Sequence, residues 1–273
     1  MLQRINTLIA NIDSSAGCLK ALVQGSAAEQ HLLQEILTKL SVPSIPAARK
    51  NIFTERLAAS GVSIVRDFLD ENETTELKQL VGQIYSAMDN AGDLSSIDPD
   101  FEKNFRTWRG VWLEPLPRFL PSDLARRFEH LATRIQDCVR DLFGHEWTFY
   151  PARSYFRRHE GAARMVPWHI DADAAALAKS ECINIWLPLD RVGTDLPSLD
   201  VVPHSHLAMR AVPLITDNDR WRDDAFVEKI GPFMAPVMAP GDAMAFDQYT
   251  LHRTQQVGGT GLVRTACEFR FSR

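Results

Sequence analysis

The spacing of apolar residues divides the chain into a helical first half and a strand-rich second half. Before Gly144, apolar positions recur every three or four residues in several separate stretches, which is the period of helices that pack on one face. From Trp147 onward, they alternate with other residues in short runs separated by turn formers. Helices followed by many short strands predict an α+β fold whose strands form an antiparallel sandwich or barrel. No internal repeat or low-complexity linker interrupts the chain, so we expect one compact unit.

Residues 1–60 are predicted to be helical. Ser26 and Glu29 have the spacing of a capping box, in which a hydroxyl and a carboxylate close the first turn of a helix. The apolar stripe that follows consists of Leu32, Leu33, Ile36, Leu37 and Leu40. Pro43 and Pro46 end this helix, because proline cannot donate the next backbone hydrogen bond. We interpret this region as a structural extension; a helix that docks a partner protein or another subunit is the alternative.

Two more helices are predicted before the strands. After a short strand at residues 61–65, Asp70 is the expected N-cap of a helix with an acidic first turn. The buried stripe of this helix consists of Leu77, Leu80, Val81, Ile84, Tyr85 and Met88. Residues 90–120 are expected to be irregular, because glycine and several prolines interrupt them. The next helix is predicted to begin with Ser122 as its N-cap and to stop at Gly144.

The predicted strands follow in the second half of the chain. Alternation runs through Phe149, Tyr155 and Phe156, and then through Ile183, Ile185, Leu187 and Leu189. Further short strands are predicted at residues 198–202, 243–246 and 264–271.

Composition and charge exclude several classes of protein. In 273 residues, 45% are hydrophobic and 24% are charged, as in ordinary globular proteins. The net charge of −5 gives no reason to expect nucleic acid or an anionic membrane as a partner. No apolar run approaches the roughly 20 residues that cross a bilayer, and the N-terminus does not read as a secretory signal. Cys18, Cys138, Cys182 and Cys267 are scattered, which indicates reduced thiols in a cytoplasmic protein.

His169 and Asp171 are the first candidate metal ligands. On an extended strand, two residues with this spacing point to the same face. Their Cα atoms would lie roughly 6–7 Å apart, so an imidazole nitrogen and a carboxylate oxygen can converge on one divalent cation. Asp173 is a rival carboxylate, but it is four residues from His169, and the two-residue spacing favours Asp171.

His252 is the best candidate for a third ligand. It follows a Pro-Gly-Asp turn and a short apolar strand, so a late strand can return it beside the earlier pair. The other histidines are expected in turns, helices and loops: His204 and His206 in a turn, His31, His130 and His145 in or next to helices, and His159 in a loop. Two histidines and one carboxylate on one face leave the opposite positions open. That ligand set is typical of non-haem Fe(II) rather than of structural zinc.

Arg264 enters an otherwise apolar strand twelve residues after His252. A buried arginine is costly unless a carboxylate meets it, and its fork of donors binds a carboxylate at two points. Such a bond is worth about 1.5–3 kcal/mol, enough to hold the distal end of a dicarboxylate cosubstrate. A salt bridge to Glu268 or Asp242 is the alternative. Glu268 lies four residues farther along the strand, which weakens that alternative.

Several further residues are candidates for a cosubstrate or substrate pocket. Asn184 and Trp186 share one strand face, and parity alone does not tell whether that face lines the interior. Tyr155 and Arg157 on the preceding strand are similar cases, and Trp168 adjoins His169. The arginines near the site are Arg153, Arg157, Arg158 and Arg164. They suggest an anionic substrate group, although a solvated charged face explains them equally well.

The order of these parts is similar to that in the phytanoyl-CoA dioxygenase family of Fe(II)/2-oxoglutarate oxygenases. Four stretches carry the resemblance: residues 61–81 as its N-terminal strand and helix, 167–171 as its first metal motif, 201–206 as a strand and a turn with a Ser-His pair, and 240–252 with Arg264 as its second metal motif and cosubstrate arginine. The resemblance covers roughly residues 55–273 and departs from the family's pattern at residues 257–260, where an Asn-x-Ser-like stretch is often expected.

The resemblance implies a double-stranded β-helix, that is, a jelly-roll or cupin-like barrel, in residues 55–273, with residues 1–54 as a helical N-terminal extension. It implies Fe(II) bound by His169, Asp171 and His252, and 2-oxoglutarate bound by Arg264. With O2, such an enzyme hydroxylates an unactivated C–H bond of a small metabolite, for example in secondary metabolism, and releases succinate and CO2. Relatives that halogenate carry a small residue in place of the aspartate, so Asp171 favours hydroxylation.

Two alternatives to this function stay open. One is a non-catalytic cupin-like protein that binds a metal or a small molecule, although His252 and Arg264 are both present. The other is an oxygenase whose substrate is bound to a carrier protein docked by residues 1–54. The same helices are also compatible with a homo-oligomer.

Overall fold

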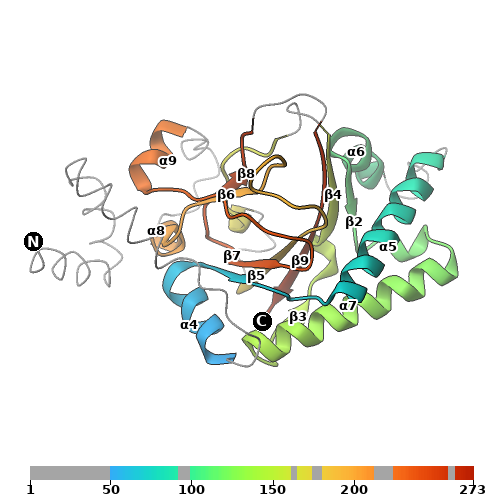
Figure 1. The fold of residues 1–273 in the computed structure, drawn as a ribbon, viewed down its shortest axis with the longest axis horizontal. Coiled ribbons are helices and arrows are strands. Elements are labelled where there is room, and N and C mark those ends of the chain that lie inside the picture. Colours follow the sequence, from blue (N-terminus) through green and yellow to red (C-terminus); the bar gives the residue numbers. More distant parts are fainter. Residues whose placement is uncertain (1–49, 92–98, 161–164, 174–179, 212–223, 258–261) are drawn as a thin grey trace, which may run out of the picture.

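The structure, a computed structural model, describes residues 50–91, 99–160, 165–173, 180–211, 224–257 and 262–273. Antiparallel sheets form its centre and long helices lie on one side of them, so the predicted α+β class is confirmed (Figure 1). The predicted helix at residues 26–40 and the loop at residues 258–260 lie outside the described residues. Within the described ranges, no helix is long and apolar enough to cross a membrane.

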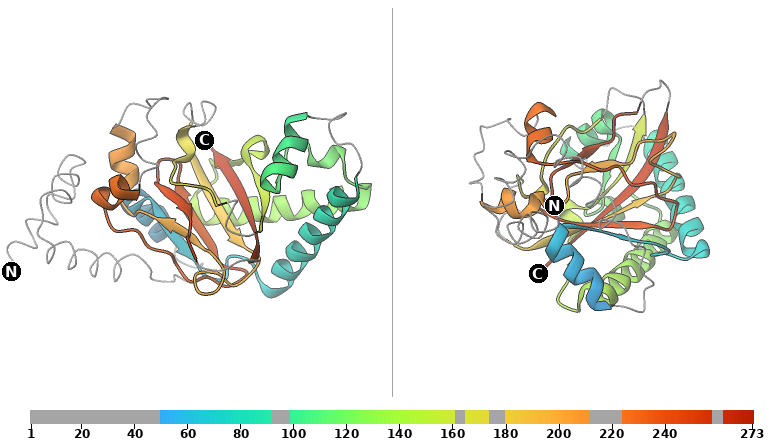
Figure 2. Two further views of the ribbon diagram at one scale, coloured as in Figure 1. Left: turned by 90° about the horizontal axis from the view of Figure 1, so that it is seen from above. Right: turned by 60° about the vertical axis from the view of Figure 1, so that its left-hand side comes forward.

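Helices dominate the first half of the described chain and are short in the second half. The α-helices are α4 (Lys50–Ser60), α5 (Glu71–Asn90), α6 (Pro99–Trp108), α7 (Ser122–Phe143), α8 (Ser205–Ala211) and α9 (Asp224–Ile230). The 3-10 helices are η1 (Leu116–Arg118), η2 (Pro151–Arg153) and η4 (Asp171–Asp173). In each view, α8 and α9 lie at the opposite side of the molecule from α5 (Figure 1, Figure 2).

The strands form two antiparallel sheets. The large sheet has seven strands: β1 (Val62–Val65), β2 (Gly110–Trp112), β3 (Thr148–Phe149), β4 (Tyr155–Glu160), β5 (Cys182–Pro188), β7 (Ala243–Asp247) and β9 (Val263–Ser272). Its order is β1-β7-β5-β9-β4-β2, and β3 also pairs with β9. The second sheet consists of β6 (Leu199–Val201) and β8 (His252–Thr254). This arrangement is the predicted double-stranded β-helix.

The helices pack on the outer face of the large sheet. The predicted stripe of α5 is confirmed, because all six of its apolar residues are buried. Asp70 caps this helix as predicted: its side chain accepts from the backbone N–H of Glu73, and the Glu73 side chain accepts from the backbone N–H of Asp70. The sheet residues that pack against the helices include Phe156, Ile183, Ile185, Leu187, Phe269 and Phe271. One hydrophobic core therefore joins the helical first half to the strands of the second half.

The inner face of the large sheet packs against the small sheet. Trp186 of β5 and Met244 and Phe246 of β7 lie in one buried cluster with Leu199 and Val201 of β6. Side chains two residues apart on a strand share a face, so these strands bury both of their faces. Burial on both faces explains why β5 and β7 have no exposed residue.

Two predictions for the first half are wrong. Residues 90–120 are not wholly irregular, since they contain α6 and β2. Pro99, which we expected to break structure, is the first residue of α6, where the missing N–H of proline costs nothing. Ser122 is the first residue of α7 rather than its cap; the N-cap is Pro121, without a side-chain hydrogen bond. Gly144 ends that helix as predicted, with a φ of 121°.

The division into residues 1–54 and 55–273 stays a prediction. Its boundary falls inside α4, whose Phe53 and Leu57 belong to the same hydrophobic core as α5 and α7. The described end of the N-terminal region is thus packed on the main fold.

Candidate metal centre

The structure brings His169, Asp171 and His252 together. One ligand atom from each lies within 4.8 Å of the other two. The backbones of His169 and His252 bond to each other in both directions, at 2.9 and 3.0 Å, so the two segments lie side by side. The two imidazole centroids are 4.1 Å apart. Asp171 belongs to η4 rather than to a strand, so the predicted extended geometry of this pair is wrong even though the convergence occurs.

Each histidine presents Nε2 to the site. Nδ1 of His169 lies 2.8 Å from the carbonyl oxygen of Pro167, and Nδ1 of His252 lies 2.9 Å from that of Thr250. A carbonyl oxygen only accepts, so each Nδ1 carries the proton and each Nε2 keeps its lone pair. This is how metal-binding histidines are oriented in proteins.

Burial keeps both imidazoles neutral. Burial, together with the neighbouring His252, lowers the pKa of His169 to about 3. Burial also lowers the pKa of His252. At neutral pH, no proton therefore competes with a metal for either Nε2.

Asp171 is held ionised by two partners on neighbouring strands. Nη2 of Arg270 donates to Oδ1 of Asp171 at 2.5 Å, and Nδ2 of Asn184 donates to Oδ2 at 3.1 Å. Burial alone would raise the pKa of Asp171, but the charge of Arg270 outweighs it and holds that pKa well below the usual range. Asn184, a predicted pocket residue, thus contacts the carboxylate itself.

The polar face of the strands lines the interior. Asn184 and Trp186 point inward from β5, because Ile183, Ile185 and Leu187 pack on the helices outside. The same alternation turns the following residues inward: Tyr155, Arg157 and His159 of β4, and Arg264, Glu268 and Arg270 of β9. The predicted pocket residues Tyr155, Arg157, Asn184 and Trp186 therefore share the interior with Arg264.

Arg264 is buried inside the barrel, with 2% of its surface exposed. Its Nη1 donates to the carbonyl oxygen of Pro197 at 3.0 Å, and its guanidinium lies 5.2 Å from the ring of Trp186. Burial and the nearby charge of Arg157 lower the pKa of Arg264 to about 10, so it stays a cation at neutral pH.

Neither of the alternative partners proposed for Arg264 pairs with it. Asp242 pairs with Arg66 at 2.6 Å, and Glu268 lies 3.4 Å from Arg270. In the described part of the chain, Nε of Arg264 has no hydrogen-bond partner.

Other buried polar atoms on the inward side of the sheets also lack partners among the described residues. They are Nε1 of Trp186, Oγ of Ser198, Oδ1 of Asn184 and Nε of Arg157. Buried polar groups are normally hydrogen-bonded. All of these atoms except Oδ1 of Asn184, which only accepts, can donate, and donors gathered beside a metal centre fit a small acid with several oxygen atoms, such as 2-oxoglutarate.

Trp168 does not join this group. It is buried in a separate cluster with Val202, Met209, Val227 and Ile230, and its Nε1 donates to Oδ1 of Asp224 at 2.7 Å. Because His169 faces the metal centre, its neighbour points the other way.

Sequence reasoning missed three interior residues. His159 was expected in a loop, but it lies buried in β4, opposite Arg264 in the strand register. Glu268 and Arg270 were not predicted as site residues. The signal that could have found them is parity, since both are an even number of residues from Arg264 along β9.

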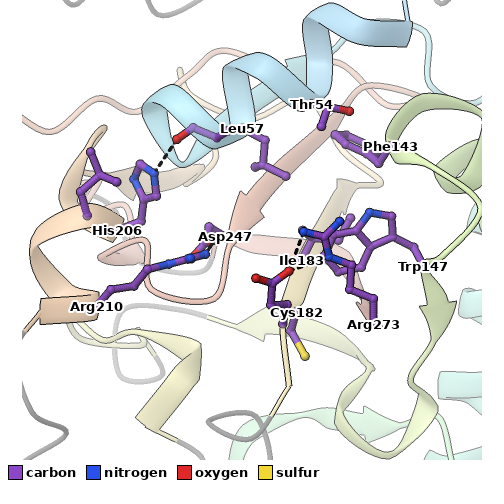
Figure 3. Close-up of a pocket in the computed structure, with 13 residues that line it drawn as sticks. Thr54, Leu57, Phe143, Trp147, Cys182, Ile183, His206, Arg210, Asp247 and Arg273 are labelled. Carbon is purple, nitrogen blue, oxygen red and sulfur yellow. Dashed lines mark hydrogen bonds and ion pairs between the residues drawn. The ribbon is translucent and has the colours of Figure 1, made fainter. Parts of the chain in front are cut away.

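A pocket of about 210 Å³ lies elsewhere, between α4, α8 and the last residues of the chain (Figure 3). None of the three candidate ligands lines it. Its arginines are already neutralised: Arg210 pairs with Asp247, and Arg273 pairs with Glu181 at 2.6 Å. The structure therefore separates this pocket from the metal centre.

An open three-ligand face of two histidines and one carboxylate, inside a double-stranded β-helix, is the arrangement of non-haem Fe(II) oxygenases. The model of the family described as phytanoyl-CoA dioxygenase (PhyH) matches residues 58–266. The chain belongs to this family and is a 2-oxoglutarate-dependent dioxygenase with Fe(II) and 2-oxoglutarate as cofactor and cosubstrate.

His204 and His206, expected to be structural, bond to the carbonyl oxygens of Ala59 and Ala58.

Three solved structures illustrate the similarity of the fold. EctD from S. alaskensis with 2-oxoglutarate and 5-hydroxyectoine has 18% sequence identity and a TM-score of 0.58, covering 85% of this chain and 79% of that one. The epimerase SnoN from nogalamycin biosynthesis has 18% identity and a TM-score of 0.56, with 83% of each chain covered. The carbocyclase SnoK from the same biosynthesis has 16% identity and a TM-score of 0.56, with 85% and 87% covered. Among curated proteins, none matches the chain.

Proposed function

We propose that the enzyme hydroxylates an unactivated C–H bond of a small metabolite. Fe(II) is bound by His169, Asp171 and His252, and 2-oxoglutarate by Arg264. The observation that carries the proposal is the convergence of three ligand atoms within 4.8 Å beside a buried arginine. When bound, Fe(II) and 2-oxoglutarate supply O2 activation and release succinate and CO2.

The three ligands bind the metal from one side. His169 and His252 donate through Nε2, while their Nδ1 bonds to backbone carbonyls fix the ring planes. Asp171 donates through a carboxylate oxygen, and Arg270 and Asn184 prevent the carboxyl group from turning. These three residues would hold the metal and would leave positions for O2 and the cosubstrate.

Arg264 binds the distal carboxylate of 2-oxoglutarate. Its Nε has no other partner among the described residues, and its Nη1 bond to Pro197 fixes the plane of the guanidinium. A planar fork aimed at one place binds a carboxylate at two points. Nε1 of Trp186 is a further unpaired donor beside it.

Hydroxylation is favoured over halogenation because Asp171 is present. A carboxylate there occupies the position that a chloride would need. The likeness to SnoN and SnoK, which act in nogalamycin biosynthesis, supports a small metabolite of secondary metabolism as the substrate. The likeness to EctD with 5-hydroxyectoine supports hydroxylation of a small molecule.

The location and the partners also belong to the proposal. Free thiols at Cys138, Cys182 and Cys267 support the cytoplasm, where thiols stay reduced. Docking of a carrier protein or of a second subunit by residues 1–54 stays a prediction. A non-catalytic binding protein is the competing function, and it would release no succinate.

Two measurements test the proposed function. Anaerobic protein with Fe(II) and 2-oxoglutarate is expected to show the weak visible charge-transfer band of chelated iron. A screen of amino acids, fatty acyl derivatives and secondary metabolites is then expected to find one that increases succinate release. Absence of the band in fully reconstituted protein would exclude the proposed centre, and a band without succinate release under any condition would favour the binding protein.

A further inference from the structure

Arg157 occupies an unusual position in the interior. It lies on the inward face of β4, and its cross-strand neighbours are Gly110 of β2 and Ala266 of β9. Neither neighbour has a side chain long enough to reach a guanidinium. The ring of Tyr155, two residues away, lies 4.8 Å from Cζ and supports one face of the group. The ring of Tyr155 therefore supports the guanidinium, and neither residue directly opposite Arg157 covers its donors.

The guanidinium of Arg157 has no polar partner in the described ranges. Its Nε is buried and unpaired, and no hydrogen bond or ion pair to its other nitrogens occurs there. Other arginines contrast with it. Arg158, the next residue, lies 3.3 Å from a carboxylate oxygen of Glu160, and Arg273 beside the outer pocket pairs with Glu181 (Figure 3). A buried donor without a partner points to a ligand that supplies the acceptor.

With Fe(II) and 2-oxoglutarate bound, the positive charge of Arg157 would have no counter-charge among the described residues. The two positive charges of Fe(II) are balanced by the two carboxylates of 2-oxoglutarate. Arg270 is balanced by Asp171, which it contacts at 2.5 Å, and Arg264 has the buried carboxylate of Glu268 on the same face of β9. Among the described residues, the partly buried Arg157 remains as one positive charge without a counter-charge, at the edge of an interior where such charges are costly.

Arg157 also lies close to the reacting region. Arg157 lies opposite Ala266 of β9, and the residues two positions to either side of Ala266 on the same inward face are Arg264 and Glu268. Glu268 in turn lies 3.4 Å from Arg270, whose Nη2 contacts the candidate metal ligand Asp171. An anion bound by Arg157 would therefore lie near both the open side of the metal and the cosubstrate.

We propose that Arg157 binds an anionic group of the primary substrate, a carboxylate or a phosphate, and so selects small anionic metabolites. This assignment rests on the proposed function, because it takes Arg264 as the partner of 2-oxoglutarate. One bound anion neutralises the excess charge, and the fork of Arg157 holds it at two points. The ring of Tyr155 holds the guanidinium in place. The bound anion therefore determines which C–H bond of the substrate lies near the metal.

The test uses the full chain loaded anaerobically with Fe(II) and 2-oxoglutarate. The charge-transfer band is recorded first, and acetate and methyl phosphate are then titrated by calorimetry. Wild type and Arg158→Gln are expected to bind at least one anion. Arg157→Gln is expected to bind it about ten- to hundredfold more weakly, and Arg157→Lys to keep part of the affinity. Arg158→Gln is the matched control, with the same change one residue away on the outward face.

Each outcome bears on the proposal. An unchanged band in Arg157→Gln together with weaker anion binding supports it, and the preferred anion identifies the carboxylate or the phosphate. Equal anion binding by wild type and Arg157→Gln, or none by wild type, overturns it. A higher demand for 2-oxoglutarate in Arg157→Gln assigns this arginine to the cosubstrate and also overturns it. Absence of the band in wild type is a failure of the proposed function, which is seen before any anion is added.

Discussion

Arg270 clamps Asp171: its Nη2 lies 2.5 Å from Oδ1, and both side chains are buried. The guanidinium also donates to the backbone carbonyl of Arg153, so its position is set from two sides. Asp171 is thus fixed before any metal arrives, and Arg270 compensates its charge. The position of Asp171 in the candidate metal centre therefore depends on Arg270 of β9.

Substitution of Arg270 is therefore expected to weaken the metal site. In Arg270→Gln, Asp171 keeps Asn184 but loses its ion pair, and the iron affinity should fall about ten- to hundredfold. The unfolding free energy should fall by about 3–5 kcal/mol, because a buried carboxylate loses its partner. Anaerobic calorimetry with Fe(II) and chemical denaturation measure the two effects. Arg273→Gln removes two more exposed ion pairs just after the same strand and should change both little. An iron affinity equal to wild type in Arg270→Gln would contradict the role of Arg270.

Substitution of Arg264 should affect the cosubstrate and spare the metal. Loss of a charge-assisted bond worth about 1.5–3 kcal/mol predicts that Arg264→Ala needs about ten- to hundredfold more 2-oxoglutarate. The iron affinity should stay near that of wild type, because Arg264 contacts none of the three ligands. Titrating each component separately, with the charge-transfer band as the signal, distinguishes the two. If iron and 2-oxoglutarate binding weakened equally, the anchor would have to lie elsewhere.

The metal-free protein should lose stability as the pH falls. The pKa of His169 is about 3 in the folded protein against an ordinary value of 6.5, so the unfolded chain binds more protons between these values. Stability from this group is fully present above pH 6.5 and is lost as the pH falls toward 3. The lowered pKa values of His252 and Asp171 act in the same direction.

Chemical denaturation at a series of pH values measures this loss. The expected slope is about 1.4 kcal/mol per pH unit for each histidine that must be protonated. His169→Gln should flatten the slope, whereas His130→Gln on the exposed face of α7 should not. A His169→Gln slope as steep as that of wild type would mean that this imidazole is not buried neutral.

Gly61 is expected to tolerate no side chain. Its φ is +75°, and a Cβ there would lie 2.4 Å from Nδ1 of His206 and 2.7 Å from Oγ1 of Thr250. Gly61→Ala should lower the unfolding free energy by roughly 2–4 kcal/mol through strain and overlap. It should also weaken iron binding, because the carbonyl of Thr250 orients His252.

Gly82→Ala is the matched control, since its added Cβ would have nothing within 4 Å in α5. Alanine is the better helix former, so this variant should be as stable as wild type or slightly more stable. Thermal unfolding of both variants, with and without Mn(II), separates the fold from the metal site. Equal effects of the two substitutions would contradict the role of the turn at Gly61.

Local patterns predicted the elements that have one buried face. The stripe of α5 is an example, because only one side of that helix meets the core. They failed for α6, where Pro99 looks like a breaker and is in fact the first helical residue. Proline has the same local chemistry whether it interrupts a helix or begins one. Only the surrounding fold decides which of the two occurs at a given proline.

The sequence predicted the candidate metal ligands, but it did not predict Arg270, which pairs with the ligand Asp171. His169, Asp171, His252 and Arg264 are residue types whose chemistry is expensive to bury, so they stand out along the chain. Parity could not choose the inner face of β5, because all seven of its residues are buried. Parity places Arg270 on the same face as Arg264, but only the strand pairing shows that it lies opposite Asn184 and so beside Asp171.

The position of β9 has a consequence for how the protein is made. In the described strands, β9 is the last to be synthesised, yet it joins β5 on one side to β4 on the other, and the two parts of the large sheet have no other contact in the strand order. A ribosome-bound chain that lacks β9 therefore holds two separate half-sheets with open edges. It also lacks Arg264 and Arg270, so the candidate metal centre and the proposed cosubstrate anchor are expected to be completed together when β9 pairs.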